Sequence, residues 1–160
     1  MLPQLDIVIG GAQKAGTSSI TSFLQRQGFT FLNPSTVLEG EISWRLEYEE
    51  AYHSARLGPG VAVGLARPNL LGLQRTHHRI ADVISDSSKV ILILRNPVFR
   101  TVSAYFHYMR DGLLPIEEVN LGLLRLLKGL EAGYPRGAEV LDFSTYADGV
   151  ESMLESVGDH

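Results

Sequence analysis

A short apolar segment that runs straight into a glycine-rich loop constrains the fold more than any other feature of this sequence. Leu5-Asp6-Ile7-Val8-Ile9 is followed at once by Gly10 and Gly11. Short apolar runs of this kind are typical of strands buried in parallel sheets. From Gly16 onward the apolar residues recur at helical spacing, and Gly28 is a signal for the end of a helix. The sequence therefore predicts a strand, a loop and a helix in direct succession.

Strands and helices are expected to alternate along the rest of the chain. The predicted strands are 29–32, 61–64 and 90–94, and the predicted helices are 45–56, 70–85, 98–110, 116–130 and 145–157. Pro97 suits the first residue of a helix, and loops are expected at 39–44 and 134–137. The leucines of 121–130 fit one apolar helix face. The alternation predicts an α/β domain with a P-loop-like, three-layer fold, in which helices flank a central parallel sheet.

The overall composition excludes several classes of protein. The 160 residues favour a single domain, covering 1–160. A formal net charge of -4 argues against a nucleic-acid binder, and the absence of cysteine excludes disulfides and cysteine-bound metals. No apolar run approaches the ~20 residues of a membrane span, and residues 1–4 lack the pattern of a signal peptide. We therefore expect a cytoplasmic protein without a membrane span.

The glycine-rich loop is a candidate phosphate site because it joins a strand to the start of a helix. Backbone N–H groups at a helix start point toward a ligand, and the helix dipole favours negative charge. Gly11 and Gly16 match the two glycines of a P-loop, but Thr17 and Ser18 follow where a nucleoside triphosphatase has Lys and then Ser or Thr. The lysine stands inside the loop, at Lys14. Lys14 could bind a single phosphate together with the hydroxyls after Gly16. The alternative is a glycine-rich turn with a solvated lysine.

A second candidate site lies where the predicted strand 90–94 meets the next helix. Arg95 follows this strand, whereas the comparable strand of a triphosphatase usually ends in an acidic residue that orders magnesium. Ligands of open α/β sheets bind beyond the carboxyl ends of the strands, and arginine suits bidentate binding of phosphate. Ser103 lies two helical turns further on and can face the same anion. Otherwise we expect Ser103 in a helix–helix contact and Arg100 in an ion pair at the surface.

These two segments together resemble a known family. Residues 9–19 resemble the 5′-phosphosulfate loop of sulfotransferases that use 3′-phosphoadenosine 5′-phosphosulfate (PAPS). Residues 90–105, with Arg-Asn-Pro-x-x-Arg-x-x-Ser-x-Tyr, resemble their 3′-phosphate motif. The carbohydrate-type branch, with its heparan sulfate enzymes and bacterial relatives, is the most similar in style. The resemblance implies these donor-binding residues: Gly11, Ala12, Gln13, Lys14, Ala15, Gly16, Thr17, Ser18 and Ser19 in the loop, and Arg95 and Ser103 at the 3′-phosphate.

The resemblance also implies a reaction. A hydroxyl or amine of a small-molecule or carbohydrate acceptor would attack the sulfur of PAPS in line and release adenosine 3′,5′-bisphosphate. Charge builds on the bridging oxygen as the S–O bond breaks, and the ammonium of Lys14 would stabilise it there. The scheme uses PAPS as a co-substrate and requires no metal.

A base should take the proton from the acceptor. In the carbohydrate branch a glutamate shortly after the first helix does this, and the corresponding segment here is 38–44. Glu41 is the better match because an apolar residue and an aromatic residue follow it, and Glu39 is the alternative. The rival bases are histidines for which we expect positions on helix surfaces: His53, His77, His78 and His107.

Two features depart from the family pattern. A segment that corresponds to Gly-Glu-Lys-Ser-Pro-x-Tyr has Leu65 and Ala66 in place of the Glu and Lys, and Arg67 could supply the lost charge. The chain is also shorter than family catalytic domains, which predicts that it lacks their C-terminal part. Two other functions therefore stay open: a non-catalytic or fragmentary domain that binds PAPS or adenosine bisphosphate, and a P-loop kinase of small molecules. The kinase would need a lysine directly after Gly16, where Thr17 stands.

Overall fold

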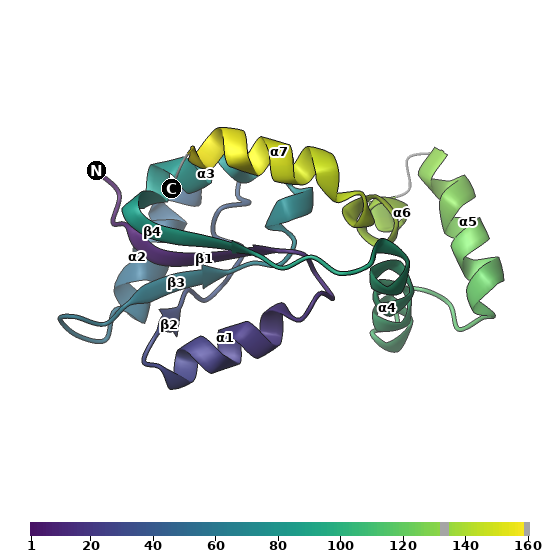
Figure 1. Ribbon diagram of the computed structural model, residues 1–160, viewed down its shortest axis with the longest axis horizontal. Coiled ribbons are helices and arrows are strands. Elements are labelled where there is room, and N and C mark those ends of the chain that lie inside the picture. Colours follow the sequence, from purple (N-terminus) through teal and green to yellow (C-terminus); the bar gives the residue numbers. More distant parts are fainter. Residues whose placement is uncertain (132–134, 159–160) are drawn as a thin grey trace.

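The computed structural model describes residues 1–131 and 135–158 and contains a sheet of four parallel strands (Figure 1). These are β1 (Leu5–Gly11), β2 (Thr30–Phe31), β3 (Val63–Ala66) and β4 (Ile84–Leu92), in the order β2-β3-β1-β4. β1 therefore lies inside the sheet, between β3 and β4, and pairs in parallel with both. The predicted strands are all present, although their bounds differ from the predicted ones.

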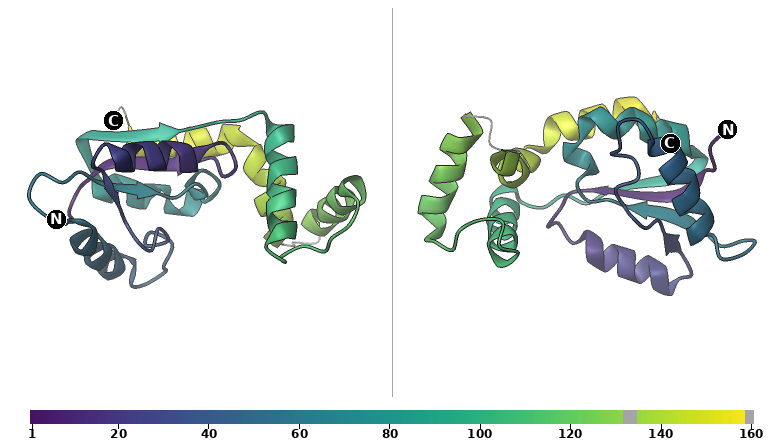
Figure 2. Two further views of the ribbon diagram at one scale, coloured as in Figure 1. Left: turned by 90° about the horizontal axis from the view of Figure 1, so that it is seen from below. Right: turned by 180° about the vertical axis from the view of Figure 1, so that it is seen from behind.

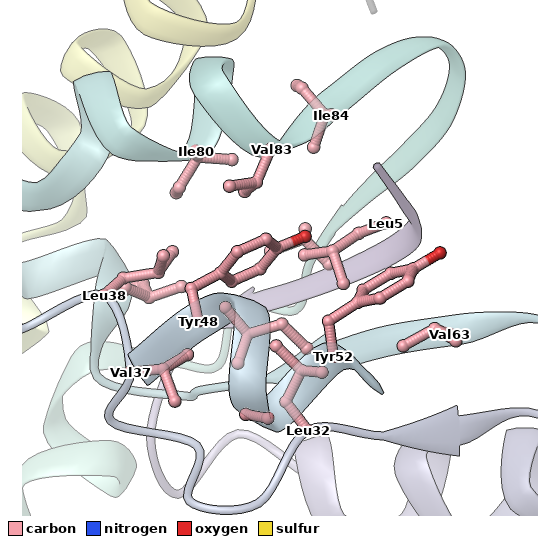
Figure 3. Packing of buried hydrophobic residues seen from close by; sticks show 14 of the residues in the cluster. Leu5, Leu32, Val37, Leu38, Tyr48, Tyr52, Val63, Ile80, Val83 and Ile84 are labelled. Atoms are coloured by element: carbon pink, nitrogen blue, oxygen red, sulfur yellow. The ribbon is translucent and has the colours of Figure 1, made fainter. Parts of the chain in front are cut away.

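Helices cover both faces of the sheet, so the predicted α/β architecture with three layers is confirmed. α1 (Thr17–Arg26) lies on one face, and α3 (His77–Val83) and α7 (Tyr146–Val157) lie side by side on the other (Figure 1). The main core joins α3 and α7 with α2 (Trp44–Ala55) and the strands. Figure 3 shows Tyr48 and Tyr52 of α2 packed among the apolar side chains of this core. None of the described helices is both long and apolar enough to cross a membrane.

A second group of helices lies beyond the carboxyl ends of the strands (Figures 1 and 2). It consists of α4 (Pro97–Arg110), α5 (Val119–Glu131) and α6 (Pro135–Val140), and it has its own cluster of buried residues: Ala104, Tyr105, Tyr108, Leu126 and Val140. α4 starts as predicted, with Pro97 as its first residue. Asn96 Oδ1 accepts hydrogen bonds from the N–H groups of Val98 at 3.1 Å and Phe99 at 3.3 Å. This side-chain cap fixes the start of the helix.

The segment 70–85 is not the continuous helix that the sequence predicts. It forms two 3-10 turns, η1 (Leu70–Gly72) and η2 (Gln74–Thr76), before α3 begins. A Cβ atom at Gly72 would stand 2.3 Å from Cδ1 of Phe143, so this ring packs directly on the backbone. Tertiary contact therefore overrides the local helical pattern.

β4 begins at Ile84, well before the predicted start at residue 90. Its first half is polar, so an apolar pattern does not reveal it. Pairing with β1 accounts for this half: Ile84 lies opposite Leu5 and Lys89 opposite Ile7, with a shift in register between the two pairs. Ser88 is fully buried, and its Oγ donates a hydrogen bond to Leu5 O at 2.5 Å. Backbone and hydroxyl hydrogen bonds thus extend the strand through residues of low hydrophobicity.

One expectation for the second half of the chain is wrong. Pro135–Gly137 is the first part of α6 and not a loop, while Tyr134, expected in the same loop, lies outside the described residues. Only some of the leucines of α5 are buried, because Leu121 is 61% exposed and Leu124 55% exposed while Leu126 is buried. α5 packs against α6 and keeps other leucines at the surface.

His77 is buried, not on the helix surface where we expected it, whereas His53 and His78 are exposed as expected. His77 Nε2 lies 2.7 Å from the carbonyl oxygen of Leu70, and Nδ1 lies 2.9 Å from Ser152 Oγ. Because a carbonyl only accepts, Nε2 donates and Nδ1 accepts from the hydroxyl. Burial lowers the pKa of His77 below its ordinary value, against smaller opposing effects of these hydrogen bonds. The histidine is therefore a neutral part of the core.

We expect the free energy of unfolding to decrease below about pH 6.5, where an unfolded histidine binds a proton and folded His77 does not. The neutral His77 contributes fully to the free energy of unfolding at pH values above the histidine pKa of the unfolded state. This contribution is lost as the pH falls through the lower pKa of the folded state. Urea unfolding between about pH 7.5 and 5.5 measures it. His77→Gln should flatten the pH dependence and His53→Gln should not; a His77→Gln variant with the wild-type slope would refute this assignment.

Candidate anion-binding site

The loop between β1 and α1 has backbone angles that glycine adopts most easily. Gly16, at the start of α1, has φ 102°, and Gly11 has φ 154°. Space is also restricted at Gly11, where a Cβ atom would stand 2.7 Å from Cβ of Leu71 and 3.0 Å from the carbonyl oxygen of Pro68. Lys14 has φ 66°, an uncommon value for a residue with a side chain. Such strain is frequent at ligand sites and persists only where the surroundings hold it.

The start of α1 is open to an anion. Gly16 provides no side-chain cap, and the first turn contains no acidic residue. The first N–H groups of a helix have no intrahelical partner, and the helix dipole makes this end positive. Ser18 and Ser19 are exposed, whereas Thr17 is 3% exposed. The loop therefore offers backbone N–H groups and two accessible hydroxyls to a ligand.

Backbone pairing brings the second predicted segment to this loop. Beyond the ends of the strands, the N–H of Ala12 donates to Ile93 O at 2.7 Å, and the N–H of Ile93 donates to Gly11 O at 2.7 Å. Arg95 follows two residues after Ile93, and its Nη1 donates to the carbonyl of Lys14 at 3.1 Å. Arg95 is exposed, so its other N–H groups are accessible. The two motifs found in the sequence thus meet at one edge of the sheet.

Arg100 does not form the surface ion pair expected from the sequence. It is 0% exposed, and it donates to the backbone carbonyls of Gln13 at 3.0 Å, Glu139 at 2.8 Å and Val140 at 3.0 Å. It also donates to Gln13 Oε1 at 3.2 Å and to Ser144 Oγ at 3.3 Å. A buried charge is tolerated when its hydrogen-bonding groups are satisfied in this way. Arg100 connects the loop to α6 and to the turn that contains Ser144.

A cleft of about 480 Å³ lies over the loop. It is lined by Gln13, Lys14, Gly16, Thr17 and Ser18 from the loop and α1, by Pro68 after β3, and by His107 and Arg110 from α4. Among the described residues, those that line the cleft include the cations Lys14 and Arg110 but no carboxylate. A concave surface with charges of one sign attracts ligands of the other sign. The cleft is therefore suited to an anionic ligand.

His107 and Arg110 are residues of the cleft that the sequence did not assign to donor binding. Arg110 Nη2 donates to His107 Nδ1 at 2.8 Å, and Asp111 Oδ2 lies 3.4 Å from the same nitrogen. Burial, and then the charge of Lys14, lowers the pKa of His107. Ser103, His107 and Arg110 share one face of α4, because they are spaced four and three residues apart. This spacing from Ser103 is the signal that could have identified them.

Two other cavities help to locate the site. One of about 280 Å³ adjoins the cleft along α1 and shares Thr17, Ser18 and Pro68 with it. A separate cavity of about 350 Å³ lies between η1 and the start of α7, and its lining contains no residue of the loop. Within 1–131 and 135–158, no three His, Asp or Glu side chains gather as a metal-binding group. The cleft is the candidate site because the loop lines it, whereas Arg95 and Ser103 of the second motif are not among its lining residues.

Comparisons with known proteins bear on the fold. No protein-family model matches the chain, and no curated protein matches its sequence. The crystal structure of a sulfotransferase from Alicyclobacillus acidocaldarius is similar to it, with a TM-score of 0.77 and 24% identity over 99% of this chain and 71% of that chain. The chain has a sulfotransferase-like fold. At this identity the similarity concerns the architecture, and the roles of single residues depend on the geometry of the site.

The candidate bases occupy different environments in this sulfotransferase-like fold. Glu39 forms an ion pair with Arg67, so the charge that Arg67 could have supplied to the site is paired. The N–H of Arg67 donates to Ile9 O at 3.0 Å, near the end of β1, and the next residue, Pro68, lines the cleft. Neither Glu39 nor Arg67 is among the residues that line the cleft. Glu41 is exposed in the segment before α2.

Two glycine substitutions separate the conformational and steric constraints on the loop. Gly16→Ala adds a Cβ atom with no neighbour within 4 Å, so only the positive φ opposes it. We expect it to lower the free energy of unfolding by about 1–2 kcal/mol. Gly11→Ala adds a collision with Leu71 and should lower it further. Urea unfolding measures both losses, and equal losses would contradict the steric role of Gly11.

Proposed function

We propose that the protein is a sulfotransferase that moves a sulfuryl group from PAPS to a hydroxyl or amine of a small-molecule or carbohydrate acceptor. The observation that carries the proposal is a cleft lined by Lys14 and the open start of α1, with Arg95 hydrogen bonded to the Lys14 carbonyl beside it. These groups suit a ligand with phosphates at two positions. The sulfotransferase-like fold supports the same assignment.

Each phosphate of the donor has candidate partners. The loop 11–19 would bind the 5′-phosphate through backbone N–H groups and exposed hydroxyls, with the Lys14 ammonium near the bridging oxygen. Arg95 and Ser103 would bind the 3′-phosphate, and arginine can do so with two parallel hydrogen bonds. Arg110, on the same face of α4 as Ser103, also lines the cleft, and its Nε is paired with Asp111 Oδ1 at 3.0 Å.

The proposed reaction exchanges one bond at sulfur for another. The acceptor oxygen or nitrogen forms a bond to sulfur while the bond from sulfur to the bridging oxygen breaks. The electron pair of the broken bond stays on that oxygen, and Lys14 stabilises the charge that develops there. A base removes the acceptor proton, and the products are the sulfated acceptor and adenosine 3′,5′-bisphosphate.

Glu41 is the proposed base, with Glu39 and His107 as its rivals. Glu41 is exposed but does not line the cleft, whereas the carboxylate of Glu39 is held by Arg67. His107 lines the cleft, and its lowered pKa leaves the ring uncharged at neutral pH. His77 is not a candidate, because both of its ring nitrogens are hydrogen bonded inside the core.

Binding of adenosine 3′,5′-bisphosphate tests the donor site directly. We expect calorimetric titration to give a dissociation constant in the micromolar range that is the same with magnesium and with a chelator. Lys14 and Arg95 would supply the charge that magnesium supplies in nucleoside triphosphatases. Binding that requires magnesium would favour the kinase instead, and absence of binding would contradict the proposed donor site.

Lys14→Ala should lower the rate of sulfuryl transfer by about 100-fold to 1,000-fold, because it removes the charge that stabilises the leaving oxygen. The fold should survive, since Lys14 is on a loop and only partly buried. Transfer from PAPS to an acceptor found by screening, together with circular dichroism, measures both. Lys89→Ala is the matched control, because Lys89 is an exposed lysine of β4 outside the cleft. An unfolded Lys14→Ala variant would make this lysine structural.

Glu41→Gln should slow turnover by about 100-fold while the affinity for adenosine 3′,5′-bisphosphate is retained, because it removes a proton acceptor and no donor contact. Glu39→Gln and His107→Gln, measured in the same transfer assay, identify the base if Glu41 is not. Wild-type turnover of Glu41→Gln would eliminate this glutamate.

A non-catalytic domain that binds PAPS or adenosine bisphosphate is the second candidate. The observation that favours it is the pairing of Arg67 with Glu39, because the adjacent Leu65 and Ala66 already replace charged residues of the family pattern. Tight binding of the bisphosphate without transfer to any acceptor would support this alternative.

A further inference from the structure

Arg100 is a buried charge that the proposed reaction does not use. It forms no ion pair among the described residues, although buried charges in proteins are usually paired. The carboxylate of Glu139 is paired with Arg136 instead, whose Nη1 donates to Oε2 at 2.6 Å, and only the backbone carbonyl of Glu139 accepts from Arg100. The N–H groups of Arg100 are instead directed at backbone carbonyls and neutral side chains. Its position must therefore serve something other than charge pairing.

The hydrogen bonds of Arg100 determine how the loop faces the cleft. In a trans peptide unit, the carbonyl and the following N–H point in opposite directions. Arg100 Nε holds the Gln13 carbonyl at 3.0 Å, so the N–H of Lys14 points away from Arg100. Arg95 holds the next carbonyl, that of Lys14, from the exposed side. Two arginines thus donate hydrogen bonds to successive carbonyl groups of a loop whose residues line the cleft.

We propose that Arg100 is a positioning residue, which holds Gln13 so that the loop presents the N–H group and the ammonium of Lys14 to the bound anion. Arg100 does not touch the anion, because it is 0% exposed and its N–H groups are engaged by Gln13, by α6 and by Ser144. The φ of 66° at Lys14 is a conformation that surrounding contacts must maintain. The inference rests on the proposed function only in taking the cleft as the anion site.

Arg100→Lys and Arg100→Met test the role, with Arg26→Met as the matched control at an exposed position of α1. Arg100→Lys keeps the charge but loses the planar set of donors, and Arg100→Met loses both. Circular dichroism and urea unfolding first establish that each variant is folded. Two readouts follow: hydrogen–deuterium exchange of the loop 12–17 without ligand, and calorimetric titration with adenosine 3′,5′-bisphosphate.

We expect the folded Arg100→Lys variant to exchange its loop amides about tenfold faster and to bind the bisphosphate about tenfold more weakly, while the amides of β1 stay protected. Arg26→Met should leave both readouts unchanged. Exchange rates and affinity equal to those of the wild-type protein in Arg100→Lys would overturn the inference. Failure of both Arg100 variants to fold would also overturn it, because Arg100 would then be a general core residue. If the wild-type protein does not bind the bisphosphate, the proposed function fails, and loop exchange alone still decides the role of Arg100.

Discussion

Parallel pairing between β1 and β4 is the interaction on which the candidate site depends. The pairing continues past the ends of the strands through Gly11, Ala12 and Ile93. The two segments therefore leave the sheet together and diverge at the same point. One becomes the glycine-rich loop and α1, and the other leads through Arg95 into α4. Because both crossovers leave from the carboxyl edge, residues far apart in sequence meet there, as is general for open α/β sheets.

Part of the connection between the two apolar clusters is polar. Arg100 stands at this join and reaches the loop on one side and α6 on the other. Hydrogen bonds from a charged group contribute about 1.5–3 kcal/mol each, and removal of the donor would leave several carbonyls unsatisfied. The join is thus stabilised by directional bonds that fix an orientation, whereas apolar contact would mainly fix a distance.

The sequence predicts the architecture better than it predicts the surroundings of individual residues. β1, α1, α2 and α4 follow from local signals, because apolar periodicity, glycine punctuation and Pro97 act within a few residues. The polar half of β4 and the break at Gly72 depend on β1 and on Phe143, which are distant in sequence. A pattern within one segment contains no information about such partners.

The same distinction holds for the site. The loop and Arg95 are found from motifs, since glycines and a charge at the end of a strand have local causes. The burial of Arg100 and His77 is not predictable, because both residue types are usually exposed and only their tertiary partners make burial tolerable. His107 and Arg110 enter the cleft through the packing of α4 beside the loop.

β4 stands at one end of the strand order, where the backbone groups of its outer edge have no partner strand in the described part of the chain. An edge strand of uniformly apolar residues would invite a strand from another molecule to add to the sheet. Here the half of β4 from Ser85 to Lys89 is rich in hydroxyls and charges, and Lys89 is exposed. The residues that make this strand hard to recognise from apolar residues are thus also of the kind that discourages edge-to-edge pairing.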